Sequence, residues 1–243
     1  MVTNSLYERN AVNREKNTIL SEVLSVHDDH WNTIAETSHY VSYRNNVMGL
    51  PILGLCDNIK LMTPDMIKNY HTANYHGDNI KVVTAGGLDH KLIHEMCEQS
   101  FKNMRPTPPN LKGYQPVPAK FTPGKMWINE PKQGDTAYSI INFEAPGYDN
   151  PDYIGFVLLS NIIGETDTSA GFLSSLSPRV GFKAVGNRVN LLRNYAKYKC
   201  CYLPYKETGL FTLYLETPLE NAHDSDALLQ AFIHDLQFSV ASV

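Results

Sequence analysis

A cluster of prolines near the middle of the chain limits its fold more than any other sequence feature. Between residues 105 and 123, the prolines are Pro106, Pro108, Pro109, Pro116, Pro118 and Pro123. Proline fixes φ and lacks a backbone N–H, so neither a continuous helix nor an interior strand can cross this stretch. We therefore predict an extended linker over residues 105–123, which joins one unit over residues 1–104 to a second over residues 124–243.

The first unit shows mainly helical patterns. Apolar residues recur at three- and four-residue spacing from about residue 12 to residue 43, with no proline or glycine before Gly49. Thr63 is suited to cap a helix that begins at Pro64, and Asp89 is suited to cap another. The predicted order is helix, helix, strand and helix, over residues 12–43, 64–75, 80–85 and 91–102.

The second unit mixes strands with helices. Asn150-Pro151-Asp152 begins a helix that Gly164 ends, and a turn over residues 204–209 separates two runs that read as antiparallel strands. The predicted strands cover residues 125–129, 137–144, 195–203 and 209–216. Further helices are predicted over residues 172–176 and from about residue 224. The chain is therefore predicted to be α+β, with two consecutive mixed units.

Charge and composition exclude several classes of protein. The 21 Lys+Arg and 25 Asp+Glu residues leave a net charge of −4, which gives no basic surface for nucleic acid. The apolar stretches fall short of the ~20 residues that a membrane-spanning helix needs. The 4 cysteines form no C-x-x-C pair, which favours a reducing compartment over a disulfide scaffold. The first fifteen residues lack the apolar core of a secretory signal.

Two glutamates stand out as candidate chemical groups. Glu15 and Glu22 are seven residues apart in the first predicted helix, which places both carboxylates on one side, ~10.5 Å apart along the axis. Ile19 and Val26 flank Glu22, so this carboxylate borders the apolar face and would benefit from a metal or another cation. The alternative is a solvated acidic row, because Glu8 continues the spacing, and the pattern alone favours that alternative.

Other polar motifs carry weaker signals. His27-Asp-Asp-His30 has metal-ligand spacing on a helix but lacks a third ligand, so a polar surface is preferred. Two further histidine pairs, His71 with His76 and His90 with His94, are interpreted in the same way. The Thr84-Ala-Gly-Gly87 stretch predicts a tight turn after a strand rather than a phosphate loop. Neither a G-x-S-x-G elbow nor a complete H-E-x-x-H or H-x-x-E-H zinc motif occurs.

Several short motifs, in collinear order, resemble those of the pitrilysin-type metallopeptidases, the inverzincins. They are Arg14–Glu22, Gly49–Gly54, Asn58–Lys60, Thr63–Tyr75, Val82–Gly87, Ala145–Tyr148, Pro151-Asp152, Ile163-Gly164 and Tyr205–Phe211. Each is weak alone, but together they cover the chain from about Arg14 to the final predicted helix. The resemblance is strongest to the β-type processing peptidases of mitochondria.

The resemblance implies a zinc site to which this chain contributes only in part. In the family, two histidines of H-x-x-E-H and a later glutamate hold zinc, and Glu22 matches that later glutamate. Glu15 matches a second carboxylate beside the site, which would assist proton transfer or orientation. The H-x-x-E-H motif would precede Met1, so this chain alone is expected to be inactive. Residues 1–104 would then be the C-terminal part of a catalytic-type domain, and residues 124–243 the N-terminal part of an inactive-type domain.

Two functional roles are implied by the resemblance. The first is a piece of a zinc endopeptidase subunit that removes presequences from imported proteins together with an α-type partner. The stretch from Gly164 to Phe172 lacks the glycine-rich loop of α-type subunits, which favours the β type. The second is a non-catalytic core subunit of respiratory complex III. Either role implies the mitochondrial matrix or the matrix face of the inner membrane. Tyr205 is interpreted as a packing residue.

Overall fold

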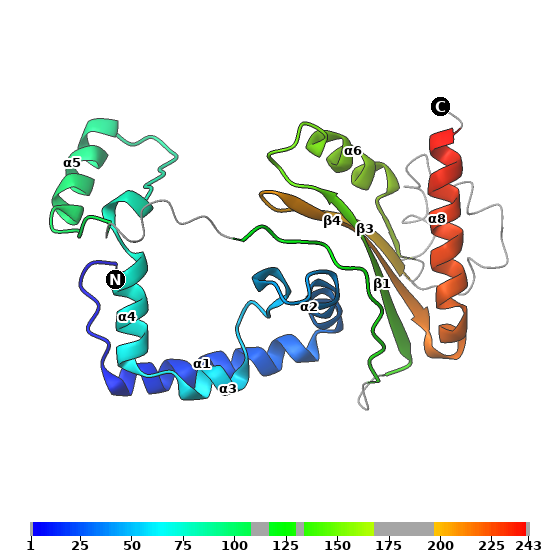
Figure 1. The fold of residues 1–243 in the computed structure, drawn as a ribbon, viewed down its shortest axis with the longest axis horizontal. Coiled ribbons are helices and arrows are strands. Elements are labelled where there is room, and N and C mark those ends of the chain that lie inside the picture. Colours follow the sequence, from blue (N-terminus) through cyan, green and yellow to red (C-terminus); the bar gives the residue numbers. More distant parts are fainter. Residues whose placement is uncertain (1, 108–116, 130–133, 168–196, 242–243) are drawn as a thin grey trace. The chain divides into compact units, whose positions relative to one another are not determined.

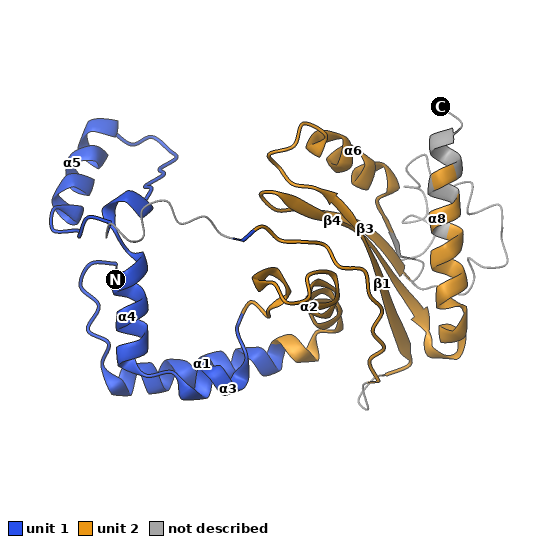
Figure 2. Ribbon diagram, in the orientation of Figure 1, with its two compact units in different colours: residues 1–25, 53–117 blue, residues 26–52, 118–243 orange. Residues whose placement is uncertain are grey.

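The computed structural model describes residues 2–107, 117–129, 134–167 and 197–241. It is a mixed α and β structure (Figure 1), in agreement with the predicted class. The chain forms two compact units (Figure 2): unit 1 comprises Met1–Ser25 with Leu53–Val117, and unit 2 comprises Val26–Ile52 with Pro118–Val243. This division is discontinuous in sequence, and the predicted arrangement of two consecutive domains with a linker over residues 105–123 remains a prediction.

Unit 1 contains short helices that begin at the predicted caps. The Thr63 side chain accepts a hydrogen bond from the Met66 amide at 3.2 Å, and Asp89 accepts one from the Leu92 amide at 2.9 Å. Each cap satisfies an N–H that the first turn of a helix leaves free. In addition to the N-terminal part of α1, unit 1 contains α3 (Cys56–Leu61), α4 (Pro64–Asn74), η2 (Gly77–Asn79) and α5 (His90–Phe101).

The single helix predicted over residues 12–43 is instead two helices, α1 (Arg9–Asp28) and α2 (His30–Ser42). Asp29 between them has φ −92° and ψ 106°, which is extended backbone. Its carboxylate accepts from the amides of Trp31 and Asn32, so it caps α2 and ends the run of helical residues. The prediction was wrong here because the apolar periodicity continues past Asp29. This aspartate ends one helix and caps the next, and neither proline nor glycine marks the interruption.

Two predicted strands are wrong. Residues 80–85 and 125–129 belong to no strand of the described structure. A β-prone segment needs a neighbouring strand to bond with, and the described strands all lie in the single sheet of unit 2. The helix predicted over residues 172–176 lies outside the described residues.

The sheet of unit 2 has four strands in the order β1-β4-β3-β2. They are β1 (Thr136–Pro146), β2 (Glu165–Asp167), β3 (Lys197–Pro204) and β4 (Thr208–Pro218). All neighbours pair antiparallel, and Ile140 of β1 lies opposite Tyr214 of β4. The sequence predicted β1, β3 and β4, but the three residues of β2 are too few to produce a pattern. β1 and β2 are the edges of this sheet.

Helices cover both faces of the sheet. On one face, α6 (Tyr153–Ile163) and α8 (Ser225–Ala241) pack over a core that includes Phe211, Leu213 and Leu215. Side chains alternate along a strand, so the intervening residues of β4 point to the other face, where Tyr214 meets Trp31 of α2 at a ring separation of 4.4 Å. Figure 1 shows α2 and α8 on the two sides of β1. The short elements η1 (Val47–Gly49) and η7 (Leu219–Asp224) are the remaining described elements of unit 2.

Candidate functional site

The two candidate glutamates lie on the part of α1 that belongs to unit 1. Glu15 and Glu22 are both exposed, whereas the neighbouring Val23 is buried. Between them, the Lys16 ammonium donates to the Lys60 carbonyl at 2.6 Å and to the Met62 carbonyl at 3.1 Å. These carbonyls close the C-terminal end of α3, where a cation is favoured. The contact fixes α1 against α3 and leaves both carboxylates accessible from solvent.

The described residues do not fit a zinc ion. A catalytic zinc needs three protein ligands and a structural zinc needs four. Among the described residues, no group of three or more histidine, cysteine, aspartate or glutamate side chains is placed to share a metal. Glu15 and Glu22 supply carboxylate oxygens alone, which are fewer protein ligands than either kind of zinc site requires.

Two histidines of the candidate pairs, His30 and His71, lie against aromatic rings. His30 stacks on Tyr138 at 4.9 Å between ring centres, and Asp29 is used as a helix cap. His71 lies 2.8 Å from the Val2 carbonyl and stacks on Tyr75. The preference for a polar surface over a metal site at these histidines remains a prediction.

His76 is the most enclosed of the histidines, and the rings of the third pair stand apart. His76 is 1% exposed, its Nε2 donates to the Ala73 carbonyl at 2.7 Å, and its Nδ1 has no partner in the described structure. The rings of His90 and His94 are 6.4 Å apart.

A tyrosine–histidine pair joins α2 to the turn between β3 and β4. The His39 Nδ1 lies 2.8 Å from the Ala35 carbonyl, which only accepts, so Nδ1 carries a proton. In the neutral ring, Nε2 therefore accepts from the Tyr205 hydroxyl at 2.5 Å. Burial, with a smaller contribution from Tyr43, raises the pKa of Tyr205 to about 12. The phenol stays protonated at neutral pH and acts as a donor, which agrees with its interpretation as a packing residue.

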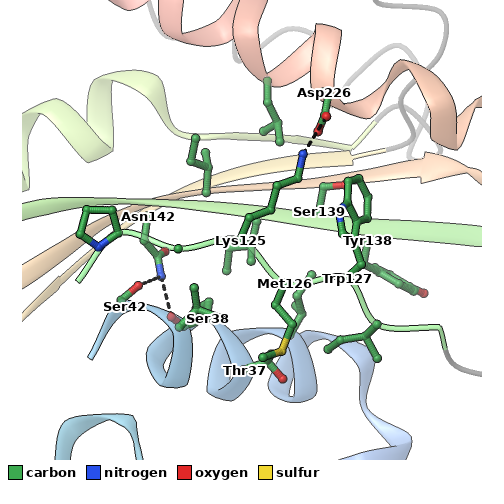
Figure 3. Close-up of a pocket in the computed structure, with 18 of the residues that line it drawn as sticks. Thr37, Ser38, Ser42, Lys125, Met126, Trp127, Tyr138, Ser139, Asn142 and Asp226 are labelled. Atoms are coloured by element: carbon green, nitrogen blue, oxygen red, sulfur yellow. Dashed lines mark hydrogen bonds and ion pairs between the residues drawn. The ribbon is translucent and has the colours of Figure 1, made fainter. Parts of the chain in front are cut away.

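A hollow of unit 2 runs along β1, and we call it the β1-edge cavity (Figure 3). Its volume is about 530 Å³. One face of α2 and one face of α8 line it, together with part of β1 and the segment over residues 121–128. The lining residues at helical spacing are Ile34, Thr37, Ser38, Val41 and Ser42 of α2, and Asp226, Leu229, Gln230 and Ile233 of α8.

Polar contacts hold the walls of the β1-edge cavity together. The Asn142 amide donates to the Ser42 hydroxyl at 3.0 Å and to the Ser38 carbonyl at 3.4 Å, and its oxygen accepts from Thr212 at 2.8 Å. These bonds join β1 to α2 and to β4. At the mouth, Lys125 pairs with Asp226 at 3.1 Å, as Figure 3 shows.

The cavity is built from segments far apart in sequence, so only one local pattern in the sequence indicates it. Its one readable signal is the set of small and hydroxyl residues on a single face of α2, where Thr37, Ser38 and Ser42 stand beside Ile34 and Val41. No helix among the described residues is long and apolar enough to cross a membrane.

Comparison with known families gives a match over most of the chain. The model described as "Peptidase M16 inactive domain" matches residues 62–239. The matched range includes the predicted linker and parts of both compact units. The resemblance to this class of metallopeptidases, inferred from short motifs, is thereby confirmed.

The curated relatives include β subunits of mitochondrial processing peptidases. The protein from Saccharomyces cerevisiae is 26% identical over 240 residues, which are 97% of this chain and 50% of that protein. The human protein is 28% identical over 217 residues, which are 88% of this chain and 42% of that protein. The chain thus spans about half the length of the curated relatives it matches.

Solved structures share the fold. A chain of complex III2 from Candida albicans, solved with Inz-5 bound, has a TM-score of 0.71 at 16% identity and covers 84% of this chain and 46% of that chain. A crystal structure of a peptidase M16 inactive domain from Pseudomonas fluorescens has a TM-score of 0.72 at 17% identity, with 97% of this chain and 54% of that chain covered. At these identities the likeness concerns the fold alone.

Proposed function

Because this chain belongs to the peptidase M16 inactive-domain family, we propose that it is part of a mitochondrial processing peptidase subunit of the β type. In this proposal the intact protein removes presequences from imported proteins in the mitochondrial matrix. It acts with an α-type partner subunit and with zinc. The supporting observation is the likeness to β subunits from yeast and human over 97% and 88% of the chain.

The contribution of this chain to the metal site would be a single carboxylate. Glu22 is the proposed ligand, and Glu15, one helical repeat earlier, is the proposed neighbouring carboxylate. Both side chains are exposed on α1. The two remaining ligands and the general base would come from an H-x-x-E-H segment outside this sequence.

A second role is favoured by the fold likeness to a chain of complex III2. There the protein would be a core subunit at the matrix face of the inner membrane, without peptidase activity. The two roles differ in their need for Glu22, because a scaffold requires no metal ligand. Co-purification with cytochrome subunits, together with absence of presequence cleavage, would support the scaffold role.

The test uses the protein extended by its upstream reading frame and paired with an α-type subunit. Cleavage of a fluorogenic presequence peptide is measured for the wild type and for Glu22→Gln, Glu15→Gln and Glu8→Gln. Loss of a metal ligand is expected to lower kcat/KM for Glu22→Gln by more than about 100-fold, beyond the range for outer-shell partners. Loss of a proton-transfer or orienting group is expected to lower kcat for Glu15→Gln by about 100-fold.

Glu8→Gln is the matched control, because Glu8 is exposed and lies one repeat before Glu15. Its activity is expected to equal that of the wild type. Full activity of Glu22→Gln, or an upstream frame without H-x-x-E-H, would overturn the peptidase proposal and leave the scaffold role.

A further inference from the structure

Unit 1 has almost no hydrophobic core of its own. Among its described residues, the buried apolar side chains are Val23 and Ile59, whereas the core cluster around Phe211 lies wholly in unit 2. A domain is stabilised by at least two packed layers that bury apolar faces between them. The described residues of unit 1 therefore lack the layer that would bury their apolar side chains.

Two helices of unit 1 expose apolar side chains at helical spacing. On α4, Met66 and Tyr70 are four residues apart and are 55% and 66% exposed. On α5, Leu92 and Met96 repeat that spacing, at 56% and 55%. Residues four apart lie on the same face of a helix, so each helix has an uncovered apolar face. Single exposed apolar residues are ordinary, but such faces on two successive helices indicate a surface that another layer covers.

The segment between α4 and α5 has the composition of a strand but no partner strand. Residues 80–85 read Ile-Lys-Val-Val-Thr-Ala, a run rich in β-branched side chains. Among the described residues, no hydrogen bond between backbone groups involves residues 81–87. Val82 and Val83 are both exposed, Val83 by 88%, and successive side chains of a strand point to opposite faces. The segment therefore has free backbone groups along its edges and apolar side chains for both faces of a sheet.

We propose that residues 80–85 pair as one strand of a sheet whose other strands come from a part of the same protein outside this sequence. The apolar faces of α4 and α5 cover that sheet. Two helices that flank a strand in sequence are suited to pack on the sheet which the strand joins. The proposal rests on the proposed function only in requiring a longer protein, and it holds for the peptidase role and for the scaffold role alike.

The missing layer is assigned to the same polypeptide because unit 1 needs it in order to fold. A unit that buries few apolar side chains is marginally stable by itself, so the layer that completes it must be present permanently. Segments of one chain meet this need, since they are held at high local concentration. The relatives from Saccharomyces cerevisiae and human have the length for such a layer, because this chain covers 50% and 42% of those proteins.

Hydrogen exchange measured by mass spectrometry tests the pairing of the strand. It is followed in this chain and in the protein extended by its upstream reading frame. We expect the amides of residues 81–85 to exchange freely in this chain and at least about 100-fold more slowly in the extended protein. The amides of β4, which has a neighbouring strand on each side, are the folded reference and should be protected in both proteins.

Oxidation of methionine by hydrogen peroxide tests the faces of α4 and α5 without any substitution. Met66 and Met96 report on these faces, and Met126 of unit 2, which is exposed to a similar degree, is the internal control. In the extended protein, we expect oxidation of Met66 and Met96 to slow by about tenfold or more relative to this chain, whereas the rate for Met126 should stay within about twofold.

Val83→Asp in the extended protein tests the burial of the strand, because it places a carboxylate inside the proposed sheet. The urea midpoint of unfolding is expected to fall by about 0.5 M or more. Val47→Asp is the matched control, since Val47 is 73% exposed in unit 2, and its midpoint should equal that of the wild type. The exchange and oxidation rates of the wild type keep the proposal testable if Val83→Asp does not fold.

Four results would overturn the proposal. The first is equally fast exchange of residues 81–85 in the two proteins, and the second is equal oxidation of Met66 and Met96. The third is protection of residues 81–85 in this chain that rises with protein concentration, which would assign the surface to a second copy. The fourth is protection in this chain at every concentration, which would assign the partner to a segment within this sequence.

Zinc content and presequence cleavage separate this proposal from the proposed function. An extended protein that protects residues 81–85 but holds no zinc and cleaves no presequence supports the missing layer and contradicts the peptidase role. An active extended protein in which residues 81–85 exchange freely overturns the missing layer and leaves the peptidase role intact.

Discussion

Asn142 is the residue whose replacement should most clearly reveal how β1 is held against α2. Its side chain makes three hydrogen bonds, to the Ser42 hydroxyl, to the Ser38 carbonyl and from Thr212, at 3.0, 3.4 and 2.8 Å. A neutral hydrogen bond contributes about 1 kcal/mol net, so Asn142→Ala removes at most about 3 kcal/mol. Because Asn142 is half-buried, water can replace part of these hydrogen bonds in the variant, and we expect the free energy of unfolding to fall by about 2 kcal/mol.

The assay is urea unfolding followed by fluorescence of Trp31, which packs on Tyr214 within unit 2. The midpoint should fall while the slope stays unchanged, since the surface exposed on unfolding is the same. Asn161→Ala is the matched control, because Asn161 is exposed on α6, and it should cost under about 0.5 kcal/mol. A loss of less than about 0.5 kcal/mol for Asn142→Ala would refute the described contact between β1 and α2.

Three further outcomes are expected. Asp29→Ala removes the cap of α2 and should cost about 1 kcal/mol in urea unfolding; no loss would contradict the break between α1 and α2. Burial raises the pKa of Tyr205 to about 12, so the unfolded phenol ionises near pH 10 while the folded one stays protonated. The stability that comes from this raised pKa is fully present below about pH 10 and is lost as the pH rises to about 12. Tyr205→Phe should therefore flatten the fall of the urea midpoint at alkaline pH. An unchanged pH profile would contradict this. Burial raises the pKa of the Cys200 thiol to about 12. Iodoacetamide should therefore label Cys56 in the folded protein well before Cys200, which mass spectrometry can measure. Equal labelling rates would contradict the burial of Cys200.

Local signals in the sequence predicted those elements whose ends are fixed by their own residues. Thr63 and Asp89 cap helices through hydrogen bonds to amides three residues later, and Gly164 ends α6 with φ 67°. The turn over residues 204–209 is short enough to make β3 and β4 neighbours. In each case the decisive interaction lies within a few residues and can be recognised from residue type.

Elements that depend on distant partners were not predictable in the same way. Residues 80–85 and 125–129 have the composition of strands, but a strand exists only when another strand supplies its hydrogen bonds. The break between α1 and α2 at Asp29 is a local effect that the periodicity hides. The apolar pattern continues across it, while the Asp29 carboxylate caps α2 and the Asp29 backbone is extended.

The candidate site was predictable to the extent that it rests on one helix. The spacing of Glu15 and Glu22 places both on one side of α1, and both are exposed. The β1-edge cavity joins residues as far apart in sequence as Ile34 and Ile233, and the bond between His39 and Tyr205 spans 166 residues. A single sequence carries almost no signal for such contacts.

The most direct test of the proposed role is the zinc content of the extended protein, measured by mass spectrometry of the purified, dialysed sample. The proposal predicts about one equivalent of zinc in the wild type and in Glu8→Gln, and almost none in Glu22→Gln, because a catalytic zinc with three protein ligands does not survive the loss of one. Zinc in Glu22→Gln at the level of the wild type would contradict it.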